Sequence, residues 1–187
     1  KDIFQQIINV LWNTFSFYKL YATQKVPVSL PKCDHVLDRW IASKMNNVIK
    51  TVTESMDKYD TVATCRSIQD FVGLLSTWYL RRSRERFKGS PNAMGVFGWV
   101  LKQLMLVMAP ITPFITELMY QNLDRQGESV HLESWPAFDE AQIDSALEEK
   151  MDYVRRVVNE GHSLRKESKI PVRQPLKECQ IINAKSK

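Results

Sequence analysis

The sequence has 187 residues, 44% of them hydrophobic and 25% charged, and its formal net charge is +5. These proportions are typical of one folded domain with at most a short appendage, and they exclude a disordered chain. No apolar run approaches the roughly 20 residues that a membrane-spanning helix requires, so we expect no membrane contact. The opening residues 1–4 have neither an initiator Met nor the layout of a signal peptide. We therefore expect the chain to be part of a longer protein.

The first predicted elements are helical, because apolar residues recur at helical spacing. We predict a helix over residues 3–21, followed by a linker at 26–31, where two prolines disfavour helix. Asp34 is expected to cap a second helix that reaches about residue 59. Asp60 is expected to cap a third helix, which runs from Thr61 to Lys88 and ends at Gly89-Ser90-Pro91.

The second half of the chain continues this pattern. We predict helices over residues 92–108 and 113–123, then a loop over 125–138 that contains an extended piece at Val130-His131-Leu132. A sixth helix is expected from Asp139 or Glu140 to about Glu160, where Gly161 would kink or end it. Residues 170–176 read as extended, and residues 178–182 read as a strand.

The predicted fold is an all-α bundle of five or six helices with a short extended C-terminal tail. We place a helical domain at residues 1–168. Residues 169–187 form the tail, which we expect to lead to a further C-terminal module.

The charge is unevenly distributed along the chain. Residues 78–102 hold six basic side chains and one acid, and residues 153–187 hold nine basic side chains and three acids. Residues 124–152, between them, hold nine acids and two basic side chains. A polyanion would be attracted to the two basic regions and repelled by the acidic one.

The three cysteines, Cys33, Cys65 and Cys179, are odd in number and far apart. Such usage favours a reducing compartment over a disulfide framework. Cys33 and His35 are the only Cys and His close together in sequence, and no second pair has the spacing of zinc ligands. We therefore predict no metal site.

The most informative segment is residues 78–88, Trp-Tyr-Leu-Arg-Arg-Ser-Arg-Glu-Arg-Phe-Lys, which we call the aromatic-arginine run. Guanidinium groups bind phosphates and stack on bases, and aromatic rings offer stacking surfaces. The run therefore predicts a surface where RNA binds. Alternatively, its aromatic residues belong to the core and its arginines form a solvated helix end.

No pattern in the sequence predicts catalysis. The three histidines have no Ser or Cys in a local nucleophile motif, and no Gly-rich phosphate loop is present. We predict no catalytic residue and no cofactor site in this chain.

Four motifs in order resemble the anticodon-binding domain of class I aminoacyl-tRNA synthetases of the isoleucyl, valyl, leucyl and methionyl group. They are Leu11-Trp12-Asn13-Thr14-Phe15-Ser16-Phe17 with Tyr21-Ala22, then Leu37-Asp38-Arg39-Trp40-Ile41, then the aromatic-arginine run, then Met108-Ala109-Pro110-Ile111-Thr112-Pro113-Phe114 with Glu117-Leu118 and, downstream, Ser134-Trp135-Pro136. The tail, Arg165 followed by Ile170-Pro171-Val172-Arg173-Gln174-Pro175-Leu176, is most similar to the isoleucyl enzymes, with the valyl enzymes the nearest alternative.

The resemblance implies a cytoplasmic enzyme that charges tRNA with its amino acid, using ATP with magnesium at a separate catalytic domain. The His-Ile-Gly-His and Lys-Met-Ser-Lys-Ser signatures of that domain are absent from this sequence. We therefore expect this chain to bind tRNA without charging it, and to contact its own catalytic and C-terminal domains in the full-length protein.

The resemblance also implies a binding surface on the first helix and at the end of the third. The predicted tRNA-binding residues are Asn13, Phe17, Tyr79, Arg82, Arg84, Arg86 and Phe87. We expect Arg82, Arg84 and Arg86 to hold anticodon-stem phosphates. Phe17 or Phe87 would stack an unpaired base, and Asn13 would hydrogen-bond a base edge.

This sequence departs from the family pattern at two positions. Thr77 stands where members often have Asn, and Lys88 stands where they often have Trp. The first change removes an amide and the second removes a possible stacking ring. A second hypothesis stays open, in which the chain is a helical protein-interaction bundle whose basic patch meets an acidic partner.

Overall fold

The computed structural model describes residues 2–123 and 127–181, with side chains from residue 7 onward. The chain divides into two compact units, Lys1–Asp144 and Ser145–Lys187. All regular elements within the described residues are helical, which confirms the predicted all-α class.

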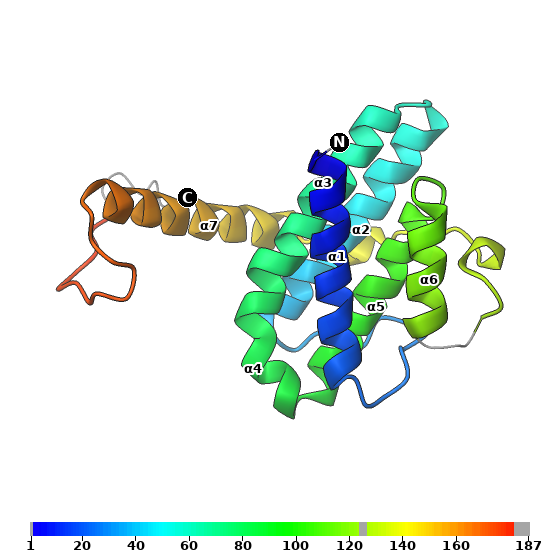
Figure 1. Ribbon diagram of the computed structural model, residues 1–187, viewed down its shortest axis with the longest axis horizontal. Coiled ribbons are helices and arrows are strands. Elements are labelled where there is room, and N and C mark those ends of the chain that lie inside the picture. The colour runs from blue at the N-terminus through cyan, green and yellow to red at the C-terminus, as the bar shows by residue number, and fades with distance from the viewer. Residues whose placement is uncertain (1, 124–126, 182–187) are drawn as a thin grey trace. The chain divides into compact units, whose positions relative to one another are not determined.

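The first unit is a helical bundle. α2 packs against α3 and α5, and α5 packs against α6. α1 runs along the bundle in contact with both α3 and α5 (Figure 1). The helices of this unit are α1 (Asp2–Tyr21), α2 (Val36–Asp57), α3 (Thr61–Leu74), α4 (Arg81–Gly89), α5 (Pro91–Met108) and α6 (Pro113–Leu123). Its most buried large side chains include Leu11, Phe15, Trp40, Ile41, Ile49, Phe71, Tyr79, Phe97, Leu101 and Leu104.

The helix starts follow from capping residues. The Asp60 side chain accepts a hydrogen bond from the Ala63 amide at 2.9 Å, which confirms it as the cap of α3. Ser90 caps α5 in the same way, with Pro91 in the first turn. The predicted cap of α2 was wrong, because His35 Nδ1 accepts from the Leu37 amide while Asp34 pairs with Lys32 at the surface.

The predicted third helix is continuous from residue 61 to 89, but its middle is a π-helix over Leu75–Leu80. In this wider turn three consecutive side chains, Trp78, Tyr79 and Leu80, are all at most 8% exposed. Wide turns of this kind recur at functional sites. Here the turn leads directly into the arginines of the aromatic-arginine run.

α1 and α5 approach closely at Gly98. A Cβ placed at this residue would lie 2.5 Å from the Tyr18 hydroxyl oxygen and 2.9 Å from the adjoining ring carbon. Tyr18 packs edge-on against Phe97 with ring centroids 5.6 Å apart. The absence of a side chain at Gly98 therefore fixes how near the C-terminal half of α1 lies to the core.

Two connecting elements differ from the prediction. Val130–Leu132 is a 3₁₀ turn rather than an extended piece, because Ser129 caps it and Glu117 accepts a hydrogen bond from the Val130 amide. Glu140–Gln142 is a second 3₁₀ turn, so the following helix does not begin at residue 139 or 140. Residues 125 and 126 of the predicted loop lie outside the described residues.

The second unit contains α7 (Ser145–Glu167), which passes through Gly161 without ending and exceeds its predicted length. Beyond it, the Arg165 guanidinium donates hydrogen bonds to the carbonyls of Pro171 and Gln174, so the tail folds into a turn. Residues 178–181 do not form the predicted strand, and Ile182 lies outside the described residues. The proposed domain boundary at residue 168 stays a prediction.

Candidate nucleic-acid interface

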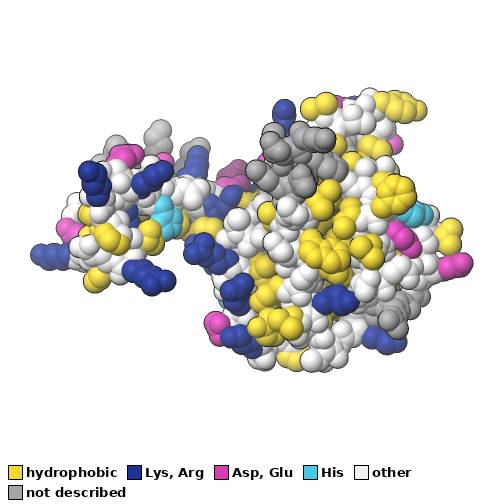
Figure 2. Space-filling view, viewed as in Figure 1, with side chains coloured by type: hydrophobic (Ala, Val, Ile, Leu, Met, Phe, Trp, Pro, Cys, Tyr) yellow, Lys and Arg dark blue, Asp and Glu magenta, His cyan; other side chains and the backbone are white. Residues whose placement is uncertain are grey.

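The aromatic-arginine run spans the end of the π-helix and nearly all of α4, beside the C-terminal half of α1. Figure 2 shows basic side chains along the edge of the first unit that α4 forms. Some side chains of the aromatic-arginine run are buried in the bundle and others are exposed, and only the exposed ones can contact a ligand directly.

One side of the run faces the core. Tyr79, Ser83 and Phe87 follow at intervals of four residues, and each is at most 4% exposed. Phe87 stacks on Phe97 with centroids 5.0 Å apart and planes inclined by 9°. Tyr79 meets Phe87 edge-on at 5.7 Å. Two of the predicted binding residues, Tyr79 and Phe87, therefore lie inside the bundle rather than on its surface.

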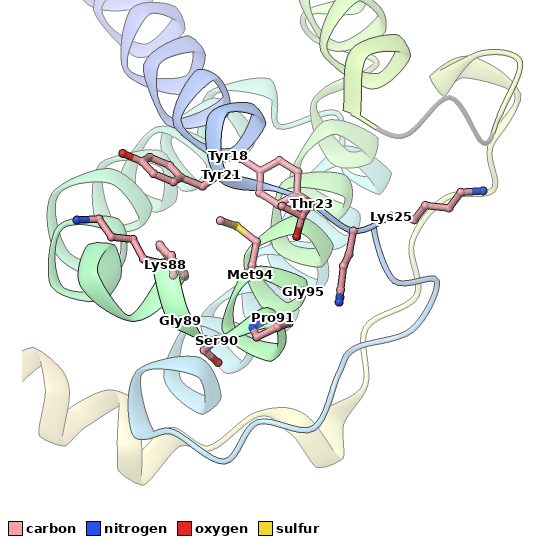
Figure 3. A pocket seen from close by; sticks show the side chains of 12 residues that line it. Tyr18, Tyr21, Thr23, Lys25, Lys88, Gly89, Ser90, Pro91, Met94 and Gly95 are labelled. Atoms are coloured by element: carbon pink, nitrogen blue, oxygen red, sulfur yellow. The ribbon is translucent and has the colours of Figure 1, made fainter.

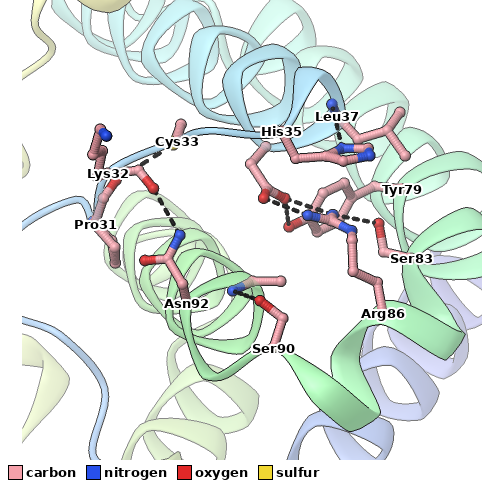
Figure 4. A network of polar contacts seen from close by, with 12 residues as sticks. Pro31, Lys32, Cys33, His35, Leu37, Tyr79, Ser83, Arg86, Ser90 and Asn92 are labelled. Carbon is pink, nitrogen blue, oxygen red and sulfur yellow. Dashed lines mark hydrogen bonds and ion pairs between the residues drawn. The ribbon is translucent and has the colours of Figure 1, made fainter.

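Arg86 lies on the same buried side and is paired within the protein. Its guanidinium donates to the two carboxylate oxygens of Asp38 at 2.5 and 2.7 Å, and to Ser83 Oγ at 2.9 Å. The Tyr79 hydroxyl donates to the same carboxylate at 2.7 Å. Figure 4 shows Tyr79, Ser83 and Arg86 side by side, with dashed lines for the bonds that link this network. Because bidentate pairs of this kind are strong, Arg86 fixes α4 against α2.

In this network the Arg86 guanidinium is charged and the Tyr79 phenol is neutral. Burial, and then the charge of Asp38, raise the pKa of Tyr79 well above its usual range, so the phenol stays a donor at neutral pH. The hydrogen bond to Asp38 raises the pKa of Arg86, so this guanidinium stays protonated. The Asp38 side chain is 2% exposed and its partner Arg86 is 22% exposed. The positive charge of Arg86 is therefore balanced before any ligand arrives.

Arg82 and Arg84 differ from Arg86 because both are exposed and both lie over aromatic rings. The Arg82 Cζ is 3.5 Å from the centroid of the Trp78 ring, and the Arg84 Cζ is 5.3 Å from that of Phe17. Within the part of the chain that is described, neither guanidinium has a hydrogen bond or an ion pair. Their donors are therefore available to a ligand.

Asn13 and Phe17 lie one helical turn apart on α1, on the side toward α4. Asn13 is exposed, and Phe17 is half-buried between Tyr21 and Phe87, with centroid distances of 4.7 and 6.1 Å. Since residues four apart share a helix face, the Asn13 amide and the Phe17 ring border one surface with Arg84.

A pocket of about 380 Å³ adjoins this surface, where α1 ends and α4 turns into α5. Figure 3 shows Tyr21 and Lys88 on one side of it and Lys25 on the other, with Met94 and Gly95 among its lining residues. Lys88 also pairs with Glu85 at 3.0 Å. The pocket therefore has an apolar interior and basic residues at its rim.

The two departures from the family pattern have identifiable roles. The Thr77 hydroxyl donates to the Gly73 carbonyl one turn earlier, at 2.7 Å. Lys88 forms the ion pair with Glu85 on the exposed side of α4. Neither side chain supplies a stacking ring.

The structure brings Asn13, Phe17 and Arg84 to one surface. Arg82 lies over Trp78, on a different side of the helix from Arg84. Sequence reasoning missed Asp38 and the supporting role of Trp78. Asp38 could have been found, because Ile41, Met45 and Ile49 continue its helix face into the core, where a carboxylate needs a partner.

Among the residues described, no three His, Cys, Asp or Glu side chains come together as they would around a metal ion. None of the described helices is both long and apolar enough to cross a membrane.

Residues 38–181 match the family described as the anticodon-binding domain of tRNA ligase. This match covers most of the chain, so the chain belongs to the family of anticodon-binding domains of tRNA ligases. The recognised motifs and the all-α fold agree with that membership.

Among curated proteins, the chain is similar to isoleucine–tRNA ligases. The chain is 41% identical over 94% of its length to isoleucine–tRNA ligase of Thermobifida fusca strain YX, and 39% identical over its full length to that of Clostridium novyi strain NT. It spans 18% and 19% of the lengths of these two proteins.

A solved structure shares the fold. The chain resembles the LeuRS in the ternary complex of Agrobacterium radiobacter K84 agnB2 LeuRS with tRNA and LeuAMS, with a TM-score of 0.56 and 20% identity. The similarity covers 75% of this chain and 16% of that one.

Proposed function

We propose that this chain binds the anticodon stem-loop of an isoleucine tRNA, on the surface that α4 and the C-terminal half of α1 form. The observation that carries the proposal is the state of Arg82 and Arg84, which lie over aromatic rings with donors free of described partners. Exposed guanidinium groups on two sides of α4, with an exposed amide and a half-buried ring on α1, suit unpaired bases and phosphates together.

The seven predicted binding residues divide into two groups under this proposal. Asn13, Phe17, Arg82 and Arg84 contact RNA directly. Arg86, Tyr79 and Phe87 hold the surface in shape from inside, because their side chains are engaged within the bundle.

In the full-length protein, we infer that this chain supports ATP-dependent charging of tRNA with isoleucine, using magnesium at a catalytic domain outside this sequence. The Thermobifida and Clostridium relatives support isoleucine over valine. The three cysteines are free of disulfides, which supports a reducing, cytoplasmic location. Contacts with the catalytic and C-terminal domains belong to the same proposal.

Binding of the 187-residue chain to three RNAs at moderate salt tests the proposal. They are an isoleucine tRNA, a valine tRNA and an isoleucine tRNA with its anticodon replaced. We expect tightest binding to the unaltered isoleucine tRNA. Equal binding to all three would leave a basic scaffold without anticodon discrimination. No binding to any of them would favour the alternative, a protein-interaction bundle with an acidic partner.

A further inference from the structure

Arg82 and Trp78 form a stacked pair on the π-helix side of α4. The two residues are one turn apart, and the Arg82 Cζ is 3.5 Å from the indole centroid. If the guanidinium plane stood upright on the indole with one nitrogen pointing at it, that nitrogen would lie about 1.3 Å nearer to the ring than Cζ does, because that is the length of the C–N bond. The nitrogen would then collide with the ring. The guanidinium therefore lies flat on the indole.

This stack leaves one face of the guanidinium open. Trp78 is 8% exposed, so its ring is covered, while the Arg82 side chain above it is exposed. Burial, and then the nearby charge of Arg81, lower the pKa of Arg82, but an arginine stays charged at neutral pH. The result is a planar cation that lies against a buried ring in a side chain that is exposed overall.

We propose that Arg82, supported by Trp78, is a platform on which one unpaired anticodon-loop base stacks. This inference rests on the proposed function and changes the role first predicted for Arg82, which was to hold a stem phosphate. A phosphate requires only a cation within reach. A base gains from a flat surface whose orientation is already fixed, because less side-chain freedom is lost on binding.

Arg81 supplies a matched comparison. It is the adjacent residue and it is exposed, but within the described residues it has no ring contact of the kind that Arg82 has. A lysine at either position keeps the positive charge and removes the plane. The lysine variants therefore separate stacking from simple electrostatic attraction.

The test uses the 187-residue chain and an isoleucine anticodon stem-loop RNA carrying 2-aminopurine at one loop position at a time. Binding is measured across a salt series for the original chain, Arg82→Lys, Arg82→Ala, Arg81→Lys and Arg81→Ala. We expect Arg82→Lys to lose about tenfold in affinity, the loss of one stacked base, with an unchanged salt slope. Arg81→Lys should keep its affinity.

The fluorescence readout reports whether one loop base stacks, which affinity alone does not, and circular dichroism of each variant shows that it is folded. With the original chain, one loop position should show a 2-aminopurine signal that changes on binding as stacking requires, and Arg82→Lys should lose that change. If Arg82→Lys binds like the original chain while Arg82→Ala flattens the salt slope, Arg82 contacts a phosphate and the inference is wrong, although the proposed function stands. If the original chain does not bind the stem-loop, both are wrong.

Discussion

Arg86 and Asp38 form an ion pair across 48 residues of sequence, joining the last turn of α4 to the first turn of α2. Arg86 thus belongs to the scaffold of the candidate interface. The pair holds α4 in place, and α4 carries the exposed residues Arg82 and Arg84. These two arginines lie over the rings of Trp78 and Phe17 and have no acidic partner among the described residues.

Asp38→Asn should destabilise the fold strongly, because it leaves the Arg86 charge without its partner. Breaking a buried pair typically costs about 3 to 5 kcal/mol of unfolding free energy. Urea unfolding followed by circular dichroism measures the loss. Asp34→Asn is the control, since that exposed carboxylate pairs with Lys32 at the surface and its replacement should change little. Equal, small effects of the two variants would show that the buried pair does not stabilise the bundle.

Arg84→Ala and Arg86→Ala should differ in how the salt dependence of tRNA binding changes. We expect Arg84→Ala to weaken tRNA binding and to reduce the salt slope by about one phosphate. Arg86→Ala should leave that slope unchanged, measured at a temperature where the variant is folded, because Asp38 already balances the Arg86 charge. A slope that falls for Arg86→Ala but not for Arg84→Ala would reverse the assignment.

Tyr59→Gly should stabilise the first unit. Tyr59 follows α2 with φ of 57°, and the Asp60 amide donates back to the Ser55 carbonyl, a helix ending that favours glycine. A left-handed conformation costs other residues about 1 kcal/mol or more, and the Tyr59 side chain is 91% exposed, so little burial is lost. Thermal unfolding should show a rise of a few degrees. Tyr59→Ala, which removes the ring but keeps the unfavourable backbone, should show no comparable rise.

Cys33 should resist alkylation while the other cysteines react. Burial, and then the charges of Asp38 and Asp34, raise the pKa of Cys33 to about 11, and the thiolate is the reactive form. Cys65 and Cys179 are exposed. With iodoacetamide at pH 8, mass spectrometry should find Cys33 modified slowest, with its rate rising as pH approaches 11. In denaturant all three should react alike, and fast labelling of Cys33 in the folded chain would contradict the account.

Most of the bundle could be predicted because its signals are local. Helical spacing of apolar residues located the helices, and Asp60 marked the start of one of them. His35 was missed as a cap because Asp is the commoner capping residue and Asp34 stands beside it. Val130–Leu132 looked extended because of its alternating pattern, but its turn depends on Glu117, which is distant in sequence.

The candidate site was predicted less completely, because its residues depend on tertiary contacts. Arg82 and Arg86 follow Trp78 at intervals of four, so helical spacing alone puts the two arginines on one stripe of the helix. Tyr79, Ser83 and Phe87, which follow one another at intervals of four, lie on the buried face instead, and Arg86 turns toward them to pair with Asp38. Spacing within one helix cannot show that Arg86 turns inward, because its partner Asp38 lies on another helix, α2.

Photo-crosslinking from position 13 tests whether the surface that α1 and α4 form contacts the anticodon loop. A benzophenone amino acid at Asn13, exposed on α1 beside Phe17, is irradiated in the presence of isoleucine tRNA and the modified nucleotide is mapped. The same group at Phe114, which is 90% exposed on α6, is the control. The account predicts crosslinks to the anticodon loop from position 13 and none there from position 114. Crosslinks from position 13 that map only to the acceptor arm, or the same loop crosslinks from both positions, would contradict it.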